Sequence, residues 1–237
     1  MCGRYALTAD VDLLVELFKL ANAPAFQLEP RYNAAPTQML PVVRFSRSGG
    51  DRRMELMRWG LVPWFAGDPS VGGRMINARA ERAAETPVFR QAMRRRRCLA
   101  PADGFFEWKE VGGRKQPYFM KLASDQPMAL AGLWERWSGG GGEPLMSFTI
   151  LTTEPNELAG QLHDRMPVVI EPKDFQHWLD PRIEEPRALR RLLAPLPAEL
   201  MKMHAVSRRV NDPANDDASL LEPVEEPPEE RATLFER

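Results

Sequence analysis

Residues 104–153 alternate between β-prone stretches and turns, and this alternation constrains the fold more than any other feature of the chain. The stretches GFFEWKEV, QPYFMKLA, MALAGLWERW and LMSFTILTT follow one another, with GGRK and SGGGGE at turn positions. Strands joined by such short turns pair as antiparallel neighbours, because a parallel pair needs a longer crossover. We therefore expect consecutive hairpins. SGGGGE is not a phosphate-binding loop, because no helix and no GK[ST] ending follows it.

Helical patterns are fewer than strand patterns in the rest of the chain. Thr8 is a suitable N-cap for a helix over residues 9–20, whose apolar residues recur at helical spacing. Thr86 would cap a second helix that begins at Pro87 and ends in an arginine run. Shorter helices are expected at 155–162, 173–179 and 185–193, and further strands at 38–46, 52–63, 163–170 and 201–207. The excess of strands predicts an α+β fold with a mainly antiparallel, β-barrel-like sheet and flanking helices.

Charge divides the chain unevenly. The overall net charge of −1 combines −7 on residues 211–237 with +6 on the rest. No linker interrupts residues 1–211, which we expect to form a single domain. Residues 212–237 form an acidic, proline-rich tail, which predicts a disordered or loosely draped segment that is either a solubilising end or an arm that mimics DNA. The positive body is compatible with a polyanionic partner.

Composition excludes several classes of protein. No stretch approaches the length of a membrane span, and the N-terminus lacks the basic-then-apolar pattern of a secretory signal. Two cysteines without a CxxC pair argue against a disulfide framework or a zinc site, so we expect no metal, no cofactor and no membrane partner. These features favour a reducing cytoplasmic compartment. Cys98 is expected to be a buried structural residue.

Cys2 directly follows the initiator methionine. Because cysteine is small, Met1 is expected to be removed, which would leave Cys2 with a free α-amine beside its thiol. Such an amine has a reference pKa of about 7.7–8.0, so a substantial fraction is neutral near neutral pH. The neutral amine can attack an aldehyde to give an imine, and the thiol can then close a five-membered thiazolidine. The alternative is that Cys2 is only a small residue tolerated after Met1.

Two further residues are candidates for moving protons. The strand period of two places Phe105 and Glu107 on one face of GFFEWKE, an apolar setting that would raise the pKa of the carboxyl. His163 lies where a short helix gives way to a strand, a frequent location for functional side chains. The competing interpretations are an exposed rim glutamate paired with an arginine, and a structural histidine bonded to the backbone.

Arginines and aromatic residues complete the candidate site. Guanidinium groups suit bidentate phosphate contacts, and aromatic faces can stack on unpaired bases. Trp59 and Trp64 stand on either side of the rigid Pro63, and core packing is the favoured interpretation for Trp59. The candidate arginines beside the other residues or at strand ends are Arg4, Arg79, Arg165, Arg208 and Arg209.

Eight motifs occur in order along the chain: MCGRYAL, RYNAAPTQ, MRWGLVPWF, INARAE, RCLAPADGFFEWK, AGLWERW, FTILTTEPN and HDRMPVVI. Together they resemble the successive motifs of the SOS-response-associated peptidase family, whose members are also described as abasic-site processing proteins. The resemblance covers Cys2 to about Asn211 and is specific because all eight motifs occur in order. Phe106 departs from the family, which commonly has tyrosine there, and the acidic tail lies outside its pattern.

The resemblance implies a fold and an activity. The fold would be a β-barrel-like sheet with flanking helices, and the activity would be capture of abasic sites in single-stranded DNA as a covalent DNA–protein crosslink. The implied catalytic residues are Cys2 as the crosslinking residue, Asn77 to position the opened sugar, and Glu107 and His163 to handle protons. The implied DNA-binding residues are Arg4, Arg79 and Arg165 for the backbone, Pro63 and Trp64 at the duplex end, and Asn33 at the floor of the site. Arg208 joins them as a DNA-binding candidate from the arginine set above, not from the resemblance.

The leading hypothesis is therefore a DNA-damage protein that forms a thiazolidine with abasic single-stranded DNA, including sites at single-strand/double-strand junctions. It would associate with the nucleoid when bound to DNA, with an AP-lyase side route from the imine. Two alternatives stay open. A cysteine peptidase could use Cys2 with His163, its target being the protein's own Met1–Cys2 bond. A simple single-strand-binding module would use the arginines and Trp64 without covalent chemistry.

Overall fold

The computed structural model describes residues 2–46 and 50–226. One of its two sheets has five strands in the order β13–β8–β7–β1–β2, and all of its pairings are antiparallel. Its strands are β1 (Tyr5–Leu7), β2 (Arg31–Ala34), β7 (Gly104–Val111), β8 (Arg114–Leu122) and β13 (Met201–Ala205). We call this the five-stranded sheet.

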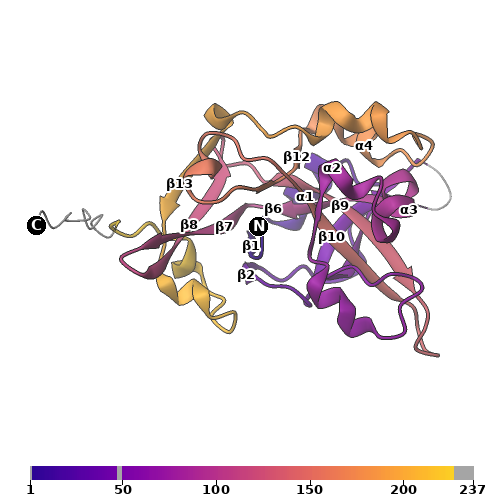
Figure 1. Ribbon diagram of the computed structural model, residues 1–237, viewed down its shortest axis with the longest axis horizontal. Coiled ribbons are helices and arrows are strands. Elements are labelled where there is room, and N and C mark those ends of the chain that lie inside the picture. The colour runs from indigo at the N-terminus through magenta and orange to yellow at the C-terminus, as the bar shows by residue number, and fades with distance from the viewer. Residues whose placement is uncertain (1, 47–49, 227–237) are drawn as a thin grey trace, which may run out of the picture.

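The second sheet closes on itself. β4, β3, β6, β9 and β10 pair in that order, and β10 then pairs in parallel with β4, so these five strands form a ring that we call the barrel. Its elements are β3 (Met39–Phe45), β4 (Arg52–Trp59), β6 (Arg97–Ala102), β9 (Met128–Trp137) and β10 (Leu145–Thr153). Three short strands extend it, β5 (Asn77–Arg79), β11 (Met166–Pro167) and β12 (Val169–Ile170). In Figure 1 the barrel lies on the right, and the five-stranded sheet extends from β13 on the left to β1 and β2 near the centre.

Helices are short and lie around the sheets (Figure 1). Within the described residues, no helix is long and apolar enough to cross a membrane. The α-helices are α1 (Val11–Phe18), α2 (Ala80–Ala83), α3 (Pro87–Arg95) and α4 (Phe175–Leu179). The 3-10 helices are Pro69–Arg74, Ala159–Gln161, Pro172–Asp174, Pro186–Leu193, Ala198–Leu200, Arg208–Asn211 and Ala218–Leu221.

The predicted α+β fold with a mainly antiparallel, barrel-like sheet is confirmed. Of the hairpins expected at 104–153, β7–β8 and β9–β10 form, whereas β8 and β9 lie in different sheets and do not pair. The first helix differs from expectation at its start. Asp10 is the N-cap, because its carboxylate accepts from the Asp12 N–H, whereas the Thr8 hydroxyl donates to Asp103. The segment 163–170 forms two two-residue strands, not one strand, and the segments 155–162 and 185–193 form 3-10 helices.

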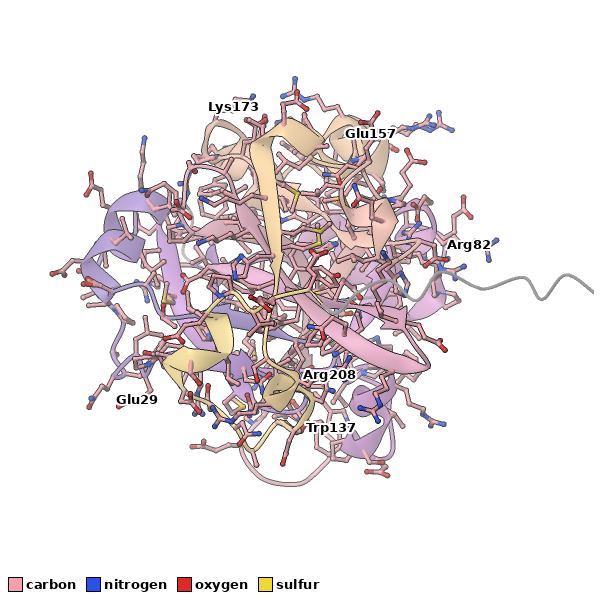
Figure 2. All side chains as sticks on the ribbon, turned by 90° about the vertical axis from the view of Figure 1, so that its left-hand side faces the viewer. Glu29, Arg82, Trp137, Glu157, Lys173 and Arg208 are labelled. Atoms are coloured by element: carbon pink, nitrogen blue, oxygen red, sulfur yellow. The ribbon has the colours of Figure 1, made fainter. Side chains whose placement is uncertain are left out.

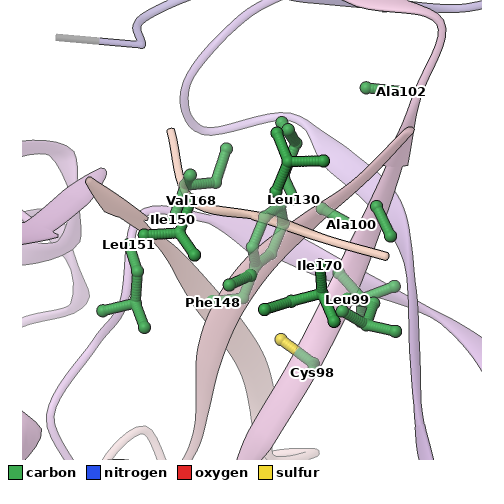
Figure 3. Close-up of a cluster of buried hydrophobic side chains, with 14 of the residues drawn as sticks. Cys98, Leu99, Ala100, Ala102, Leu130, Phe148, Ile150, Leu151, Val168 and Ile170 are labelled. Atoms are coloured by element: carbon green, nitrogen blue, oxygen red, sulfur yellow. The ribbon is translucent and has the colours of Figure 1, made fainter. Parts of the chain in front are cut away.

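The interior of the barrel is filled by buried apolar side chains. Figure 3 shows Cys98, Leu130, Phe148 and Ile150 in one cluster, all fully buried. A smaller cluster lies under the five-stranded sheet and consists of Ala6, Phe106, Phe119, Val206, Val210 and Leu220. β7 therefore separates two cores, with Phe105 packed in the larger one and Phe106 in the smaller.

The first half of the predicted tail differs from the expected disorder. One Asp216 carboxylate oxygen accepts from the backbone N–H groups of Tyr32 and Asn33, at 2.6 and 2.9 Å. Leu220 is fully buried, and the Val224 N–H donates to the Ala205 carbonyl oxygen at 2.9 Å. Residues 212–226 therefore pack on the domain, because their apolar and carboxylate groups find partners that the negative charge of the segment does not reveal. Residues 227–237 lie outside the described part of the chain.

Candidate functional site

Strand pairing brings Cys2 next to Glu107. β1 and β7 run antiparallel with Tyr5 opposite Phe105, and the Phe106 N–H donates to the Arg4 carbonyl oxygen at 3.0 Å. Because the two strands are antiparallel, continuing this pairing from Arg4 toward the N-terminus leads toward Glu107 on β7. Both Cys2 and Glu107 are buried, at 0% and 3% exposure. The expectation that Glu107 lies in an apolar setting is confirmed, and the exposed-rim alternative is wrong.

The end of β10 positions the other half of the site. Its residues Ile150–Thr152 pair in parallel with β5, which carries Asn77 and Arg79. Thr152 and Thr153 also pair with β11, which directly follows His163 and Arg165. Two sequence segments about ninety residues apart are thus held on the same short stretch of one strand. The Asn77 side-chain N–H donates to the Cys2 carbonyl oxygen at 2.8 Å, which joins this half to β1.

Burial dominates the electrostatics of the candidate cluster, by which we mean Cys2, Asn77, Glu107 and His163. Burial raises the pKa of the Cys2 thiol, and the nearby Glu107 charge raises it further. Burial also raises the pKa of Glu107, although the nearby His163 charge opposes this shift. The thiol is therefore kept protonated, and the carboxyl can hold a proton closer to neutral pH than an exposed glutamate can.

His163 is held by its own turn. Its Nδ1 lies 3.0 Å from the Arg165 backbone N–H and 2.7 Å from an Asp164 carboxylate oxygen. The two contacts compete for one nitrogen, because a neutral Nδ1 accepts from the N–H whereas a protonated one donates to the carboxylate. Nε2 makes no hydrogen bond to any described residue. The local backbone contact expected of a structural histidine is present, and it leaves the second nitrogen available for proton transfer.

Arg4 and Asn33 form an internal network. The Arg4 Nη1 donates to Asn33 Oδ1 and to the Val210 carbonyl oxygen, both at 2.8 Å, and burial lowers the pKa of the guanidinium. The Asn33 Nδ2 donates to carbonyl oxygens of 210, 212 and 215. Asn33 is 1% exposed, and its side chain bonds to Arg4 and to the backbone of the segment after β13.

Three other candidate arginines differ in the hydrogen bonds and ion pairs that their side chains make. Arg79 is exposed, and its side chain makes no hydrogen bond or ion pair with the described residues. Arg165 forms a two-pronged ion pair with Glu81 at 2.8 Å. The Arg208 Nε donates to the side chain of buried Gln116 at 3.2 Å, and Figure 2 shows Arg208 among the 3-10 helices that follow β13. Of the three side chains, only that of Arg79 makes no hydrogen bond or ion pair with the described residues.

Trp64 and Trp59 have opposite environments. Trp59 is fully buried and its indole N–H donates to the Ile76 carbonyl oxygen, which confirms the core assignment. Trp64 is 64% exposed and packs edge-on against Phe65, itself 56% exposed, with ring centroids 5.5 Å apart. Pro63 is buried just before them. The loop starts at Gly60, whose φ of +119° and approach to the Gly72 carbonyl oxygen leave no room for a side chain.

Two features of the site were not predicted from the sequence. Phe65 follows Trp64 in the motif RWGLVPWF, but periodicity does not tell an exposed aromatic pair from a buried one. Glu81 closes the motif INARAE, and only the fold brings it to Arg165. Within the described ranges 2–46 and 50–226, no group of three or more His, Cys, Asp or Glu side chains is arranged to hold a metal ion.

Comparisons with known proteins agree with this geometry. The model of the family described as SOS response associated peptidase (SRAP) matches residues 1–213. The chain is 41% identical over 224 residues to the abasic site processing protein YoqW of Bacillus subtilis, covering 94% of this chain and 99% of that protein. It is 31% identical to the abasic site processing protein YedK of Escherichia coli, covering 94% of this chain and 100% of YedK. For the abasic site processing protein HMCES of Gallus gallus, identity is 32%, covering 83% of this chain and 67% of HMCES.

Solved structures share the fold. A protein from Bacteroides thetaiotaomicron superimposes with a TM-score of 0.84 at 22% identity, covering 94% of this chain and 100% of that one. A protein from Bordetella bronchiseptica gives a TM-score of 0.74 at 26% identity, covering 87% of this chain and 100% of that one. Because the family model and the relatives both span nearly the whole chain, this protein belongs to the SOS response associated peptidase family.

Proposed function

We propose that this protein senses abasic sites in single-stranded DNA and captures them covalently through Cys2. The observation that carries the proposal is the convergence of the candidate cluster, in which the Asn77 amide contacts the Cys2 backbone while the charges of Glu107 and His163 act on the same small region. Relatives 31–41% identical to this chain are named abasic site processing proteins. An abasic site carries the aldehyde that an aminothiol requires.

The first step requires the removal of Met1, which lies outside the described residues. Its removal turns the Cys2 backbone nitrogen from an amide into an amine with a reference pKa of about 7.7–8.0. The amine attacks C1′ of the open-chain sugar, and the hydroxyl that results leaves as water to give an imine. Asn77, bonded to the Cys2 carbonyl oxygen, holds this end of the chain in place during the attack.

Glu107 supplies and recovers protons in this scheme. Because burial raises its pKa, the carboxyl can donate a proton to the departing hydroxyl. The resulting carboxylate can then take the proton from the Cys2 thiol as the sulfur adds to the imine carbon. Loss of water leaves a protonated imine, whose nitrogen keeps its one hydrogen as the sulfur adds, so the ring closes to a neutral secondary amine and Glu107 regains its proton. The balance is one aldehyde and one aminothiol giving one thiazolidine and one water. His163, which acts electrostatically on Glu107, is the second group able to carry a proton.

The DNA would be held mainly by its backbone. Arg79 is exposed and unpaired among the described residues, and Arg4, Arg165 and Arg208 lie on elements that adjoin the cluster. Trp64 and Phe65 offer exposed aromatic faces on which an unpaired base or the end of a duplex can stack. Contacts of this kind carry little sequence information, so binding should weaken with salt and show little sequence preference.

The buried, neutral thiol argues against a cysteine peptidase. Nucleophilic cysteines usually have a lowered pKa, set by a neighbouring cation, whereas both burial and Glu107 raise that of Cys2. In the thiazolidine route the amine attacks first, so a protonated thiol is no obstacle. Cleavage of the protein's own Met1–Cys2 bond remains compatible with this route, because it would liberate the amine. An AP-lyase side route would start from the same imine.

One gel distinguishes the three functions. Purified protein is mixed with a single-stranded oligonucleotide bearing one abasic site, and with a matched oligonucleotide bearing a tetrahydrofuran analogue that has no aldehyde. An adduct that survives denaturation only with the true abasic site supports capture. Equal, reversible binding of both oligonucleotides would indicate a binding module. Peptide hydrolysis without an adduct would indicate a peptidase.

Two further measurements test the role of the terminal amine. Intact mass must show that Met1 is absent from the active material, and acetylation of the terminal nitrogen must abolish the adduct.

A further inference from the structure

The guanidinium of Arg165 is already occupied by a carboxylate. Its Nη1 and Nη2 donate to the two Glu81 oxygens, each at 2.8 Å, and Nη2 also donates to the Thr152 carbonyl oxygen. The Nε is buried and has no acceptor among the described residues. Arginine has five N–H groups. These contacts and the burial of Nε leave one Nη1 hydrogen that a ligand could reach.

A phosphate therefore cannot form a two-pronged contact with Arg165 while Glu81 is in place. Carboxylate and phosphate oxygens fit the same face of a guanidinium with similar spacing. The two anions must compete for this face, and one of them has to leave before the other can bind.

The two partners are not equally free to move. The Arg165 side chain is 14% exposed and is anchored to the backbone of β10 through Thr152. The Glu81 side chain is 49% exposed and sits on α2, a helix of four residues. Glu81 is also within the electrostatic influence of Arg79, whose charge lowers its pKa after the larger effect of the Arg165 hydrogen bond. Glu81 is thus an ionised, surface-accessible group that can swing into solvent while Arg165 stays in position.

We propose that Glu81 is a built-in competitor of the DNA backbone, occupying the phosphate-binding face of Arg165 in the free protein and being displaced by a phosphate beside the lesion. This inference rests on the proposed function. It gives Glu81 a role in specificity. A strand without an aldehyde meets the cost of displacing Glu81 and gains no covalent bond, so it dissociates readily, whereas an abasic strand is retained by the crosslink.

Glu85 offers a matched control for a test of this competition. It lies one helical turn after Glu81, is exposed, lines the same surface groove of about 480 Å³, and makes no ion pair with the described residues. Glu81→Gln and Glu85→Gln remove the same charge from the same groove, so any difference between them reports the contact with Arg165. Thermal unfolding of both variants checks that each is folded.

The measurement is the dissociation constant for an unmodified single-stranded oligonucleotide at fixed salt. We expect Glu81→Gln to tighten binding by about three- to tenfold, whereas Glu85→Gln changes it by less than about twofold. The gain from Glu81→Gln must disappear when Arg165→Gln is also present, as in a double-mutant cycle. Equal effects of the two glutamine variants, or weaker binding by Glu81→Gln, would overturn the proposal. Adduct yield of the unaltered protein is scored separately, so a failure of covalent capture is distinguished from a failure of the competition.

Discussion

The two cysteines of the chain lie in comparable burial and differ in what surrounds them. Cys2 and Cys98 are both free thiols, both fully buried, and burial raises the pKa of both. Cys98 lies in the barrel, and its sulfur packs closely against Gly132. A Cβ added at Gly132 would lie only 2.9 Å from that sulfur. Cys2 lies beside the Glu107 carboxyl and under the Asn77 amide. Burial alone therefore does not distinguish the two thiols, whereas the polar neighbours and the titratable group beside Cys2 do.

The largest expected effect separates these two thiols. Cys2→Ala should reduce the covalent adduct by about 100-fold or more, because the ring cannot close without sulfur, while reversible DNA binding persists. Cys98→Ala should leave the adduct intact and cost about 1 kcal/mol of folding free energy through the small cavity it leaves. Denaturing gels and thermal unfolding measure the two effects. An adduct of normal yield from Cys2→Ala would contradict the proposed chemistry.

The second prediction compares two buried glutamates. Glu107→Gln should slow adduct formation by about 10²–10⁴-fold, because the general acid is removed. The matched control is Glu135→Gln in the barrel, where Glu135 is 4% exposed and pairs with Arg96 at 2.7 Å. That variant should lose stability and keep the rate constant of adduct formation. Single-turnover rates and unfolding midpoints of both variants test this division.

The pH dependence of Glu107 sharpens the same comparison. Its pKa is raised in the folded protein, so its contribution to stability is fully present below the unfolded-state pKa and is lost as pH rises through the folded-state value. Glu107→Gln should therefore be more stable than the parent protein at neutral pH, with the difference vanishing in acid. Urea unfolding at several pH values would measure it. A variant less stable at neutral pH would show that Glu107 is held by favourable contacts that outweigh its burial.

A third pair of variants tests the two tryptophans. Trp59→Ala should destabilise the fold by about 3–5 kcal/mol, because a fully buried ring is lost from the barrel core. Trp64→Ala should leave stability unchanged and weaken DNA binding by about 1–3 kcal/mol, the range for one lost base-stacking contact. Thermal unfolding and fluorescence anisotropy give the two quantities. Unchanged affinity in Trp64→Ala would remove the exposed aromatic pair from the binding surface.

The smallest expected effect concerns Arg79. Arg79→Gln should weaken single-strand binding several-fold and reduce the slope of log affinity against log salt by about 0.7, as expected for one lost phosphate contact. Arg94 on α3 is also exposed and makes no side-chain contact with the described residues, so Arg94→Gln is the control. Salt titrations of both variants measure the two slopes. An identical change in slope for the two would mean that only overall charge is sensed.

Local patterns predicted much of the fold. The hairpins β7–β8 and β9–β10 appear at the expected turns because strand period and glycine turns are local properties, whereas the assignment of β8 and β9 to different sheets was missed. The split of 163–170 into two short strands and the α1 N-cap at Asp10 were missed. Strand boundaries depend on which neighbour the segment meets, and the choice between Thr8 and Asp10 depends on the contact of Thr8 with Asp103.

The sequence by itself determined the identity of the reactive groups and the alternation of β7, since residue type and a period of two are written along the chain. The motifs that resemble the family also grouped Asn77, Glu107 and His163 in one predicted site. Only the tertiary structure decided which side chains are unpaired and which are already bonded to another residue. The closure of the barrel by β4 and β10, the occupation of Arg165 by Glu81 and the packing of residues 212–226 all depend on contacts between distant segments. Such contacts arise from the three-dimensional register of strands, which no local pattern specifies.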